Sequence, residues 1–137
     1  MNKISFAFLG LVCACLFAAI GCAPKAPYEL VEISGAASYQ GTPLPEGFRV
    51  EFEPTDGSRP SFGVIQPGGK FELVHTASQK GVKTGTCKVR VYWNDNPETN
   101  PAPEEYREML SKYGMGGEEA PEIEVAKKDK NFKVDFE

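Results

Sequence analysis

The sequence is poor in the residues on which most enzymes and metal sites depend. It contains one histidine, His75, and four cysteines among 137 residues. It has no G-x-S-x-G nucleophile elbow, so a catalytic triad would have to be built around Ser61 and His75. The acid of that triad would be Asp56 or Asp95. One imidazole provides no zinc ligand set. These absences predict a protein that is not an enzyme and that has no metal centre and no cofactor.

Clustered positive charge is also missing. The chain has 15 basic and 19 acidic residues, with a formal net charge of −4. The basic stretch 127–130 is interrupted by an acidic residue and predicts a solvated turn. Without a track of Lys and Arg, the chain does not have the electrostatic features of a nucleic-acid-binding protein.

Side chains that carry oxygen gather between Asn94 and Glu98, where Asp95 and Asn96 complete the group. Calcium takes oxygen ligands of this kind. The spacing follows no known calcium loop, however, and Asn-Asp-Asn-Pro is also ordinary turn composition. The sequence leaves both interpretations open.

The one long hydrophobic run lies at the amino terminus. Seventeen uncharged residues, 4–20, follow a short positive start at Lys3 and end at Gly21-Cys22. A run of this length is at the lower limit for spanning a bilayer. Small residues before a cut favour a signal peptide. Cys22 after Ala-Ile-Gly resembles the bacterial lipobox, although Ala19 stands where Leu is usual.

In a lipobox the thiol receives a diacylglyceryl group and becomes the new first residue. We therefore predict a lipoprotein signal peptide at 1–21, a lipidated tether at 22–29 and one domain at 30–137. The alternatives are an ordinary secretory signal peptide and an uncleaved anchor helix. Cys15 is a second candidate for lipidation, but a cut there would leave apolar chain behind it.

Only Cys87 would remain in the domain, so no internal disulfide is expected. In TCKVRVYW, alternation places Cys87 on the apolar face with Val89, Val91 and Trp93. This pattern predicts a buried cysteine that fills the core. A reactive or dimerising thiol is the alternative.

Alternation with period two recurs through the rest of the chain. It predicts strands at 31–39, 48–54, 61–66, 70–75, 87–93, 122–126 and 131–137. Turn-rich loops are expected at 40–47 and 76–85, and Pro67-Gly-Gly is expected to close a hairpin. We therefore predict an all-β fold, an antiparallel β-sandwich of about seven strands.

The only helical signal lies at 104–114, in the last long loop. Tyr106, Met109, Leu110 and Tyr113 recur at i, i+3, i+4 and i+7 and form one apolar stripe. Glu104 and Glu105 favour the positive end of a helix, and Gly114 can terminate it. A helix this short must pack against the body of the protein to persist.

The order of these segments resembles the transthyretin-like, carboxypeptidase regulatory-like domains, and specifically small lipoproteins of the planctomycete type. The matching positions are Gly35, Tyr39, Gly41, Pro43, Leu44, Val50, Phe52, Pro54, Gly69, Phe71, Leu73, Gly85 and Val89. The chain departs from the pattern at Cys87, where an aromatic residue is usual, and at Gln66-Pro67. The resemblance implies the fold. It implies no hydrolase activity, because the terminal Tyr-Arg-Gly-Ser motif of the hydrolase members is replaced by VDFE.

These observations predict a non-enzymatic lipoprotein of the cell envelope, periplasmic or on the outer surface, held in a membrane by lipid on Cys22. Its partner would be an envelope protein or a polysaccharide. The alternative is a carbohydrate- or peptide-binding protein that uses the 94–121 insertion, with Tyr92, Tyr106 and Tyr113 as contact residues. Tyr92 has a second interpretation, in which it packs under the helix.

Overall fold

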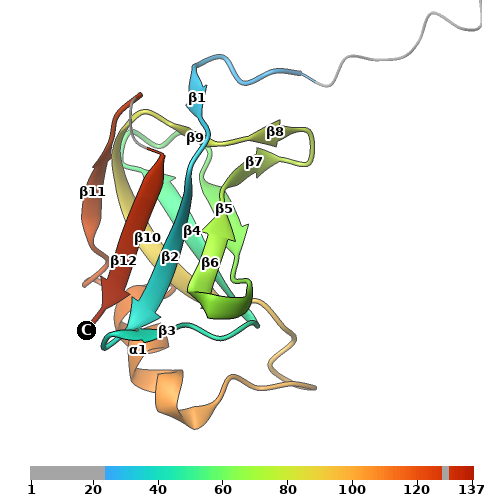
Figure 1. The fold of residues 1–137 in the computed structure, drawn as a ribbon, viewed down its shortest axis with the longest axis vertical. Coiled ribbons are helices and arrows are strands. Elements are labelled where there is room, and N and C mark those ends of the chain that lie inside the picture. The colour runs from blue at the N-terminus through green and yellow to red at the C-terminus, as the bar shows by residue number, and fades with distance from the viewer. Residues whose placement is uncertain (1–23, 128–129) are drawn as a thin grey trace, which may run out of the picture.

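The computed structural model describes residues 24–127 and 130–137. Cys22 and the predicted signal peptide 1–21 therefore lie outside the described residues. Two sheets pack face to face, with the amino-terminal segment at one end and the only α-helix of the described residues at the other (Figure 1). The predicted β-sandwich is confirmed.

The larger sheet has six strands, and every pair in it is antiparallel. Their order in space is β11 (Glu122–Val125), β10 (Gly85–Trp93), β4 (Phe48–Pro54), β5 (Ser61–Val64), β7 (Val74–Thr76) and β8 (Gln79–Lys80). The longest pairing joins β10 to β4 from Cys87↔Pro54 to Trp93↔Phe48. Alternating apolar side chains of these two strands face the core.

The smaller sheet is built around β2 (Ser34–Tyr39). It also contains β12 (Asn131–Phe136), β3 (Thr42–Pro43) and β6 (Lys70–Glu72). A separate pair, β1 (Leu30–Val31) with β9 (Val82–Lys83), lies where the amino-terminal segment joins the body. The turns between strands include two 3-10 segments, η2 (Pro67–Gly69) and η3 (Glu104–Tyr106).

One strand pair departs from the antiparallel expectation, because β12 runs parallel to β2. After β11 the chain leaves the larger sheet and enters the smaller one, where β12 starts at the same end as β2 (Figure 1). A crossover between sheets does not have to reverse the strand direction as a hairpin does. Alternation in the sequence predicts a strand here but gives no direction to it.

The expected hairpin is also only partly correct. The turn at Pro67–Gly69 is present, but the expected strand 70–75 divides into β6 and β7, which belong to different sheets. Phe71 and Leu73 are both buried, so the chain stays within the core while it crosses. Gly63 makes the close approach possible, because a Cβ there would lie 2.8 Å from the Glu72 carbonyl oxygen.

Three other local expectations need correction. The loop at 76–85 contains the short strands β8 and β9, and the turn at 40–47 contains β3. The expected strand 31–39 is interrupted between β1 and β2. These segments are two to six residues long. Pairing with a neighbouring strand creates such elements, and local alternation is too short to reveal them.

Cys87 is fully buried, as the sequence predicts. Desolvation raises the pKa of its thiol to about 11. The thiolate, which is the reactive form, is therefore suppressed in the fold. This supports the interpretation of Cys87 as a core residue.

The helix forms where the apolar stripe predicts it. η3 leads directly into α1 (Arg107–Tyr113), and the Gly114 amide donates to the Leu110 carbonyl at its end. Met109 is fully buried and Tyr113 nearly so, with the Tyr113 ring centroid 5.1 Å from that of Phe136. The helix closes one end of the sandwich with apolar side chains.

Candidate functional site

The segment that follows the predicted lipidation site lies against the body of the protein. The Ala26 amide donates to Gln79 Oε1 at 3.2 Å, and the Tyr28 hydroxyl lies 3.2 Å from His75 Nε2. The Tyr28 and His75 rings meet edge to face, with centroids 5.6 Å apart. We call this region the tether junction: Ala26, Tyr28, Ser61, His75 and Gln79. The predicted tether 22–29 is thus attached to the domain well before β1 begins.

Beneath Tyr28, a second hydrogen bond holds the same imidazole. Ser61 Oγ lies 3.0 Å from His75 Nδ1, and both residues are buried. The structure thus brings together Ser61 and His75, two members of the triad that could be assembled from the sequence, from β5 and β7. Burial, and then the nearby Arg59 charge, lower the pKa of His75 from its ordinary value of 6.5. The imidazole is held in its neutral form.

The third member of a triad is missing from this arrangement. His75 Nε2 bonds to the Tyr28 hydroxyl, whereas Asp56 forms an ion pair with Lys83. Asp95 lies in the turn after β10, where its carboxylate bonds to Asn96 and Asn100. A serine nucleophile needs both a base oriented by an acid and access to substrate. Ser61 has 0% exposure.

Charged groups surround the tether junction. The Lys83 ammonium lies over the Tyr28 ring, 4.9 Å from its centroid, and bonds to Ser58 as well as Asp56. These bonds from Lys83 and Ser58 hold the pKa of Asp56 well below its usual range. Arg59 Nε donates to the His75 carbonyl. The Arg59 charge, after burial, disfavours a positive charge on the His75 ring.

A second candidate site lies on the outer surface of the larger sheet. Arg49 on β4 is paired with Tyr92 on β10 and with Val64 on β5. Its guanidinium carbon is 5.2 Å from the Tyr92 ring centroid and 5.9 Å from that of Phe62. Such contacts are attractive because the ring faces are electron-rich. We call this surface the outer sheet face: Arg49, Glu51, Phe62, Val64 and Tyr92.

The outer sheet face carries exposed apolar side chains next to partly buried charged groups. Phe62 is 36% exposed and Val64 44% exposed. The Arg49 Nε atom is buried and has no hydrogen-bond partner among the described residues. Burial is the main cause that raises the pKa of Glu51. Exposed apolar side chains around partly desolvated charges are features of protein contact surfaces.

The three tyrosines predicted as contact residues do not form one cleft. Tyr92 lies on the outer sheet face, where Arg49 is its neighbour. Arg90, two residues earlier in β10, is the residue that donates to the Gly114 and Gly117 carbonyls after the helix. Tyr106 packs edge-on against Phe48 with ring centroids 4.9 Å apart.

Tyr113 is buried, and its hydroxyl donates to the Glu137 carbonyl. Tyr106 and Tyr113 therefore use their rings mainly to attach the helix to the sandwich. Of the three residues, Tyr92 has the position best suited to an external contact.

The oxygens between Asn94 and Glu98 serve the turn in which they lie. Asp95 accepts from the Asn96 amide and from Asn100, and Asn96 Oδ1 accepts from the Glu98 amide. In residues 24–127 and 130–137, no three His, Cys, Asp or Glu side chains come together as a metal site. This arrangement favours the turn interpretation over the calcium interpretation.

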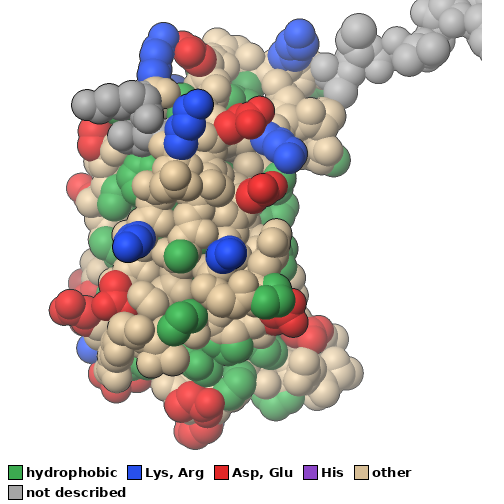
Figure 2. Space-filling view, in the orientation of Figure 1, with side chains coloured by type: hydrophobic (Ala, Val, Ile, Leu, Met, Phe, Trp, Pro, Cys, Tyr) green, Lys and Arg blue, Asp and Glu red, His purple; other side chains and the backbone are tan. Residues whose placement is uncertain are grey.

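Two hollows lie away from the 94–121 insertion, and a third lies beside it, lined by Glu53, Arg90 and Glu122. One of about 390 Å³ follows β2 between β12 and β6, over small side chains and between Lys70 and Lys133. Its face of the molecule is the one seen in Figure 2, where cationic side chains stand on either side of the middle of the sheet. A smaller hollow lies near Leu73 and Lys130.

The described residues were also searched for membrane-spanning helices, and the chain was compared with known proteins. No helix in the part of the chain that the structure describes is long and apolar enough to cross a bilayer. Comparison with family models, with curated proteins and with solved structures found no match to the chain. The resemblance to the carboxypeptidase regulatory-like lipoproteins remains a prediction.

Proposed function

We propose that this protein is a lipid-anchored, non-enzymatic module of the bacterial envelope. The observation that carries the proposal is the position of Cys22, directly after an uncharged run and four residues before Ala26, whose amide bonds to Gln79 of the domain. An acylated cysteine there would hold the sandwich at a membrane by hydrocarbon chains alone.

The anchor is tested by growing cells that express the full chain with a radioactive fatty acid. Wild-type protein should carry label, and the Cys22→Ser variant should carry none. Cys15→Ser is the matched control, because it removes the other cysteine considered for lipidation, and it should leave the label unchanged. Label that persists in Cys22→Ser would refute the site.

The non-enzymatic part of the proposal is supported by the state of the Ser61–His75 pair. Both side chains are buried, and the imidazole bonds to Tyr28 in place of a carboxylate. Such a pair stabilises a junction but offers no open position to a substrate. A fluorophosphonate probe, which reacts with activated serines, should not label the native protein. Labelling that disappears in Ser61→Ala would overturn this assignment.

The outer sheet face supports a role in contact with a partner. Its exposed Phe62 and Val64 adjoin the Arg49–Tyr92 pair, and aromatic and arginine side chains contribute most to contact energies. A photo-crosslinking residue at Val64, in intact cells, should capture a specific partner. The same residue at Met115, which is 86% exposed beside the helix, is the control.

The alternative function is binding of a carbohydrate or peptide by the 94–121 insertion. The same pair of crosslinkers separates it from the first proposal. Capture through Met115 with none through Val64 would move the contact surface to the insertion.

A further inference from the structure

The attachment of the tether limits how the domain can stand on a membrane. Ala26 and Tyr28 bond to Gln79 and His75, and Leu30 then pairs with Lys83. Only four peptide steps separate Cys22 from Ala26. Fully extended, they reach about 14 Å. Strand β10 alone, with nine residues, is roughly 30 Å long. The helix end therefore cannot swing to a surface in which Cys22 is embedded while the tether junction is intact.

The two ends of the molecule also differ in charge. The 94–121 insertion, at the helix end, contains seven carboxylates and two cations, a net charge of −5 in a chain whose total is −4. Figure 2 shows acidic side chains around this end, whereas several cationic side chains stand among acidic ones near the tether. The lysines of the tether end include Lys25, Lys80, Lys83, Lys127 and Lys130.

Some tether-end lysines have acidic neighbours within the protein. Lys127 pairs with Glu29 at 2.6 Å, and Lys80 pairs with Glu72 at 3.6 Å. All four of these side chains are more than half exposed. Exposed pairs of this kind contribute little to stability, so the lysines can exchange them for phosphates.

We propose that the tether end of the sandwich, formed by the tether junction, the β7–β8 hairpin and Lys127, rests on an anionic lipid surface, with the acidic helix end directed away from it. This inference rests on the proposed lipid anchor. Anionic headgroups would attract the lysines of the tether end and repel the carboxylates of the helix end. Their field falls off within about 10 Å at 0.1 M salt, so it acts mainly on groups close to the surface. Lysines held near Cys22 lie within that range.

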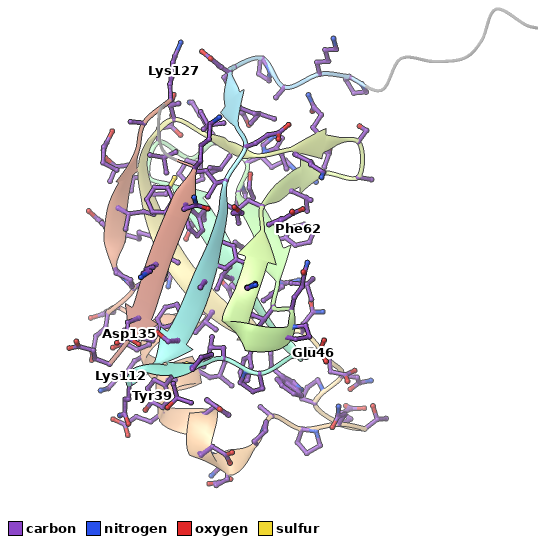
Figure 3. All side chains as sticks on the ribbon, in the orientation of Figure 1. Tyr39, Glu46, Phe62, Lys112, Lys127 and Asp135 are labelled. Carbon is purple, nitrogen blue, oxygen red and sulfur yellow. The ribbon has the colours of Figure 1, made fainter. Side chains whose placement is uncertain are left out.

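The test uses the full chain, purified in its membrane-bound form and placed either in phosphatidylglycerol vesicles or in neutral detergent micelles. A limiting dose of an amine-acetylating reagent is followed by mass spectrometry of each lysine. Lys25, Lys80 and Lys127 should react several-fold more slowly on vesicles than in micelles. Lys112, at the helix end, is the internal control and should react equally in both; Figure 3 shows Lys127 and Lys112 at opposite ends of the molecule.

A variant links the orientation to the tether junction. Tyr28→Ala removes the hydroxyl and ring that contact His75, so the tether becomes longer in effect and the protection of Lys80 and Lys127 should decrease towards the micelle value. Tyr92→Ala, on the outer sheet face, is the matched control and should retain full protection.

The outcomes distinguish the two proposals. Equal acetylation of both ends on vesicles, with a diacylglyceryl group found on Cys22 by intact mass, would overturn the orientation and leave the anchor in place. An intact mass without lipid would overturn the anchor, and with it the orientation. Protection of Lys112 in place of Lys80 would show that the molecule stands the other way up.

Discussion

The two ends of the sandwich are closed by different chemistry. At the helix end, Met109 and Tyr113 bury apolar surface against the sheets, and ring contacts such as Phe48–Trp93, with centroids 4.9 Å apart, complete the seal. At the tether end, Ser61, His75 and Tyr28 form a chain of hydrogen bonds. Apolar burial gives a large net stabilisation, whereas a hydrogen bond replaces one made to water and gives a small one.

The difference suggests separate roles for the two ends. The helix end supplies stability, because its contacts continue the apolar core. The tether end supplies geometry, because hydrogen bonds depend on direction and fix where the amino-terminal segment leaves the domain. Substitutions that sample both ends test this division directly.

The largest effect is expected at the helix end. Met109 has 0% exposure, so Met109→Ala leaves a cavity and should lower the free energy of unfolding by about 2–5 kcal/mol. Urea unfolding measures it. Met115→Ala is the control, because the same residue type six positions on is exposed, and it should change stability by at most ~0.5 kcal/mol. Equal effects of the two variants would show that α1 does not contribute to the core.

A smaller loss is expected from the buried serine of the tether junction. Ser61→Ala leaves His75 Nδ1 buried without its hydrogen bond and should cost about 1–3 kcal/mol in the same assay. Ser111→Ala, on the exposed side of α1, provides the comparison and should be close to neutral. If Ser61→Ala were as damaging as Met109→Ala, the two ends would not differ in the way proposed.

The pH dependence of folding stability also tests the difference between the two ends, because His75 lies in the tether junction. The pKa of His75 is lowered in the fold, so below pH 6.5 the unfolded chain binds a proton that the folded chain resists. The stability contributed by neutral His75 should be complete above about pH 6.5 and should be lost as the pH falls from there. His75→Gln should remove this dependence. Asp56 titrates far lower, since its pKa is depressed, and so does not interfere. An unchanged slope in His75→Gln would assign the dependence to another group.

Much of the architecture could be predicted, because some patterns are local. The alternation of Phe48, Val50 and Phe52 and the stripe through Met109 each depend on a few neighbouring residues, and both faces are buried as expected. The parallel pairing of β12 with β2 depends on residues about 97 positions apart, such as Asn131 and Ser34. No local pattern encodes that partner.

The candidate sites show the same limit. Alternation places Arg49 and Tyr92 outside, but only the register of β4 and β10 puts one beside the other. Ser61 and His75 could be chosen as chemical candidates, yet their sequence gives no sign that Tyr28, 47 residues before His75, bonds to the other nitrogen of the imidazole. Tyr28 carried a weak signal, as the one aromatic residue of the predicted tether 22–29.

The smallest effect on global stability is expected from Tyr28→Phe, which removes one hydroxyl and keeps the ring against His75 and Lys83. Loss of a single partly exposed hydrogen bond should cost roughly 0.5–1.5 kcal/mol. Because Ala26 and Tyr28 precede the first strand and bond to the surface hairpin β7–β8, they can detach without unfolding the core. Amide exchange at 26–31 should therefore accelerate while exchange in β4 and β10 stays unchanged, whereas Met109→Ala should accelerate both. Tyr39→Phe is the matched control, since Tyr39 packs near Tyr106 at the opposite end. If Tyr28→Phe accelerated exchange throughout β10, the tether would belong to the same cooperative unit as the core, and the two ends would share one role.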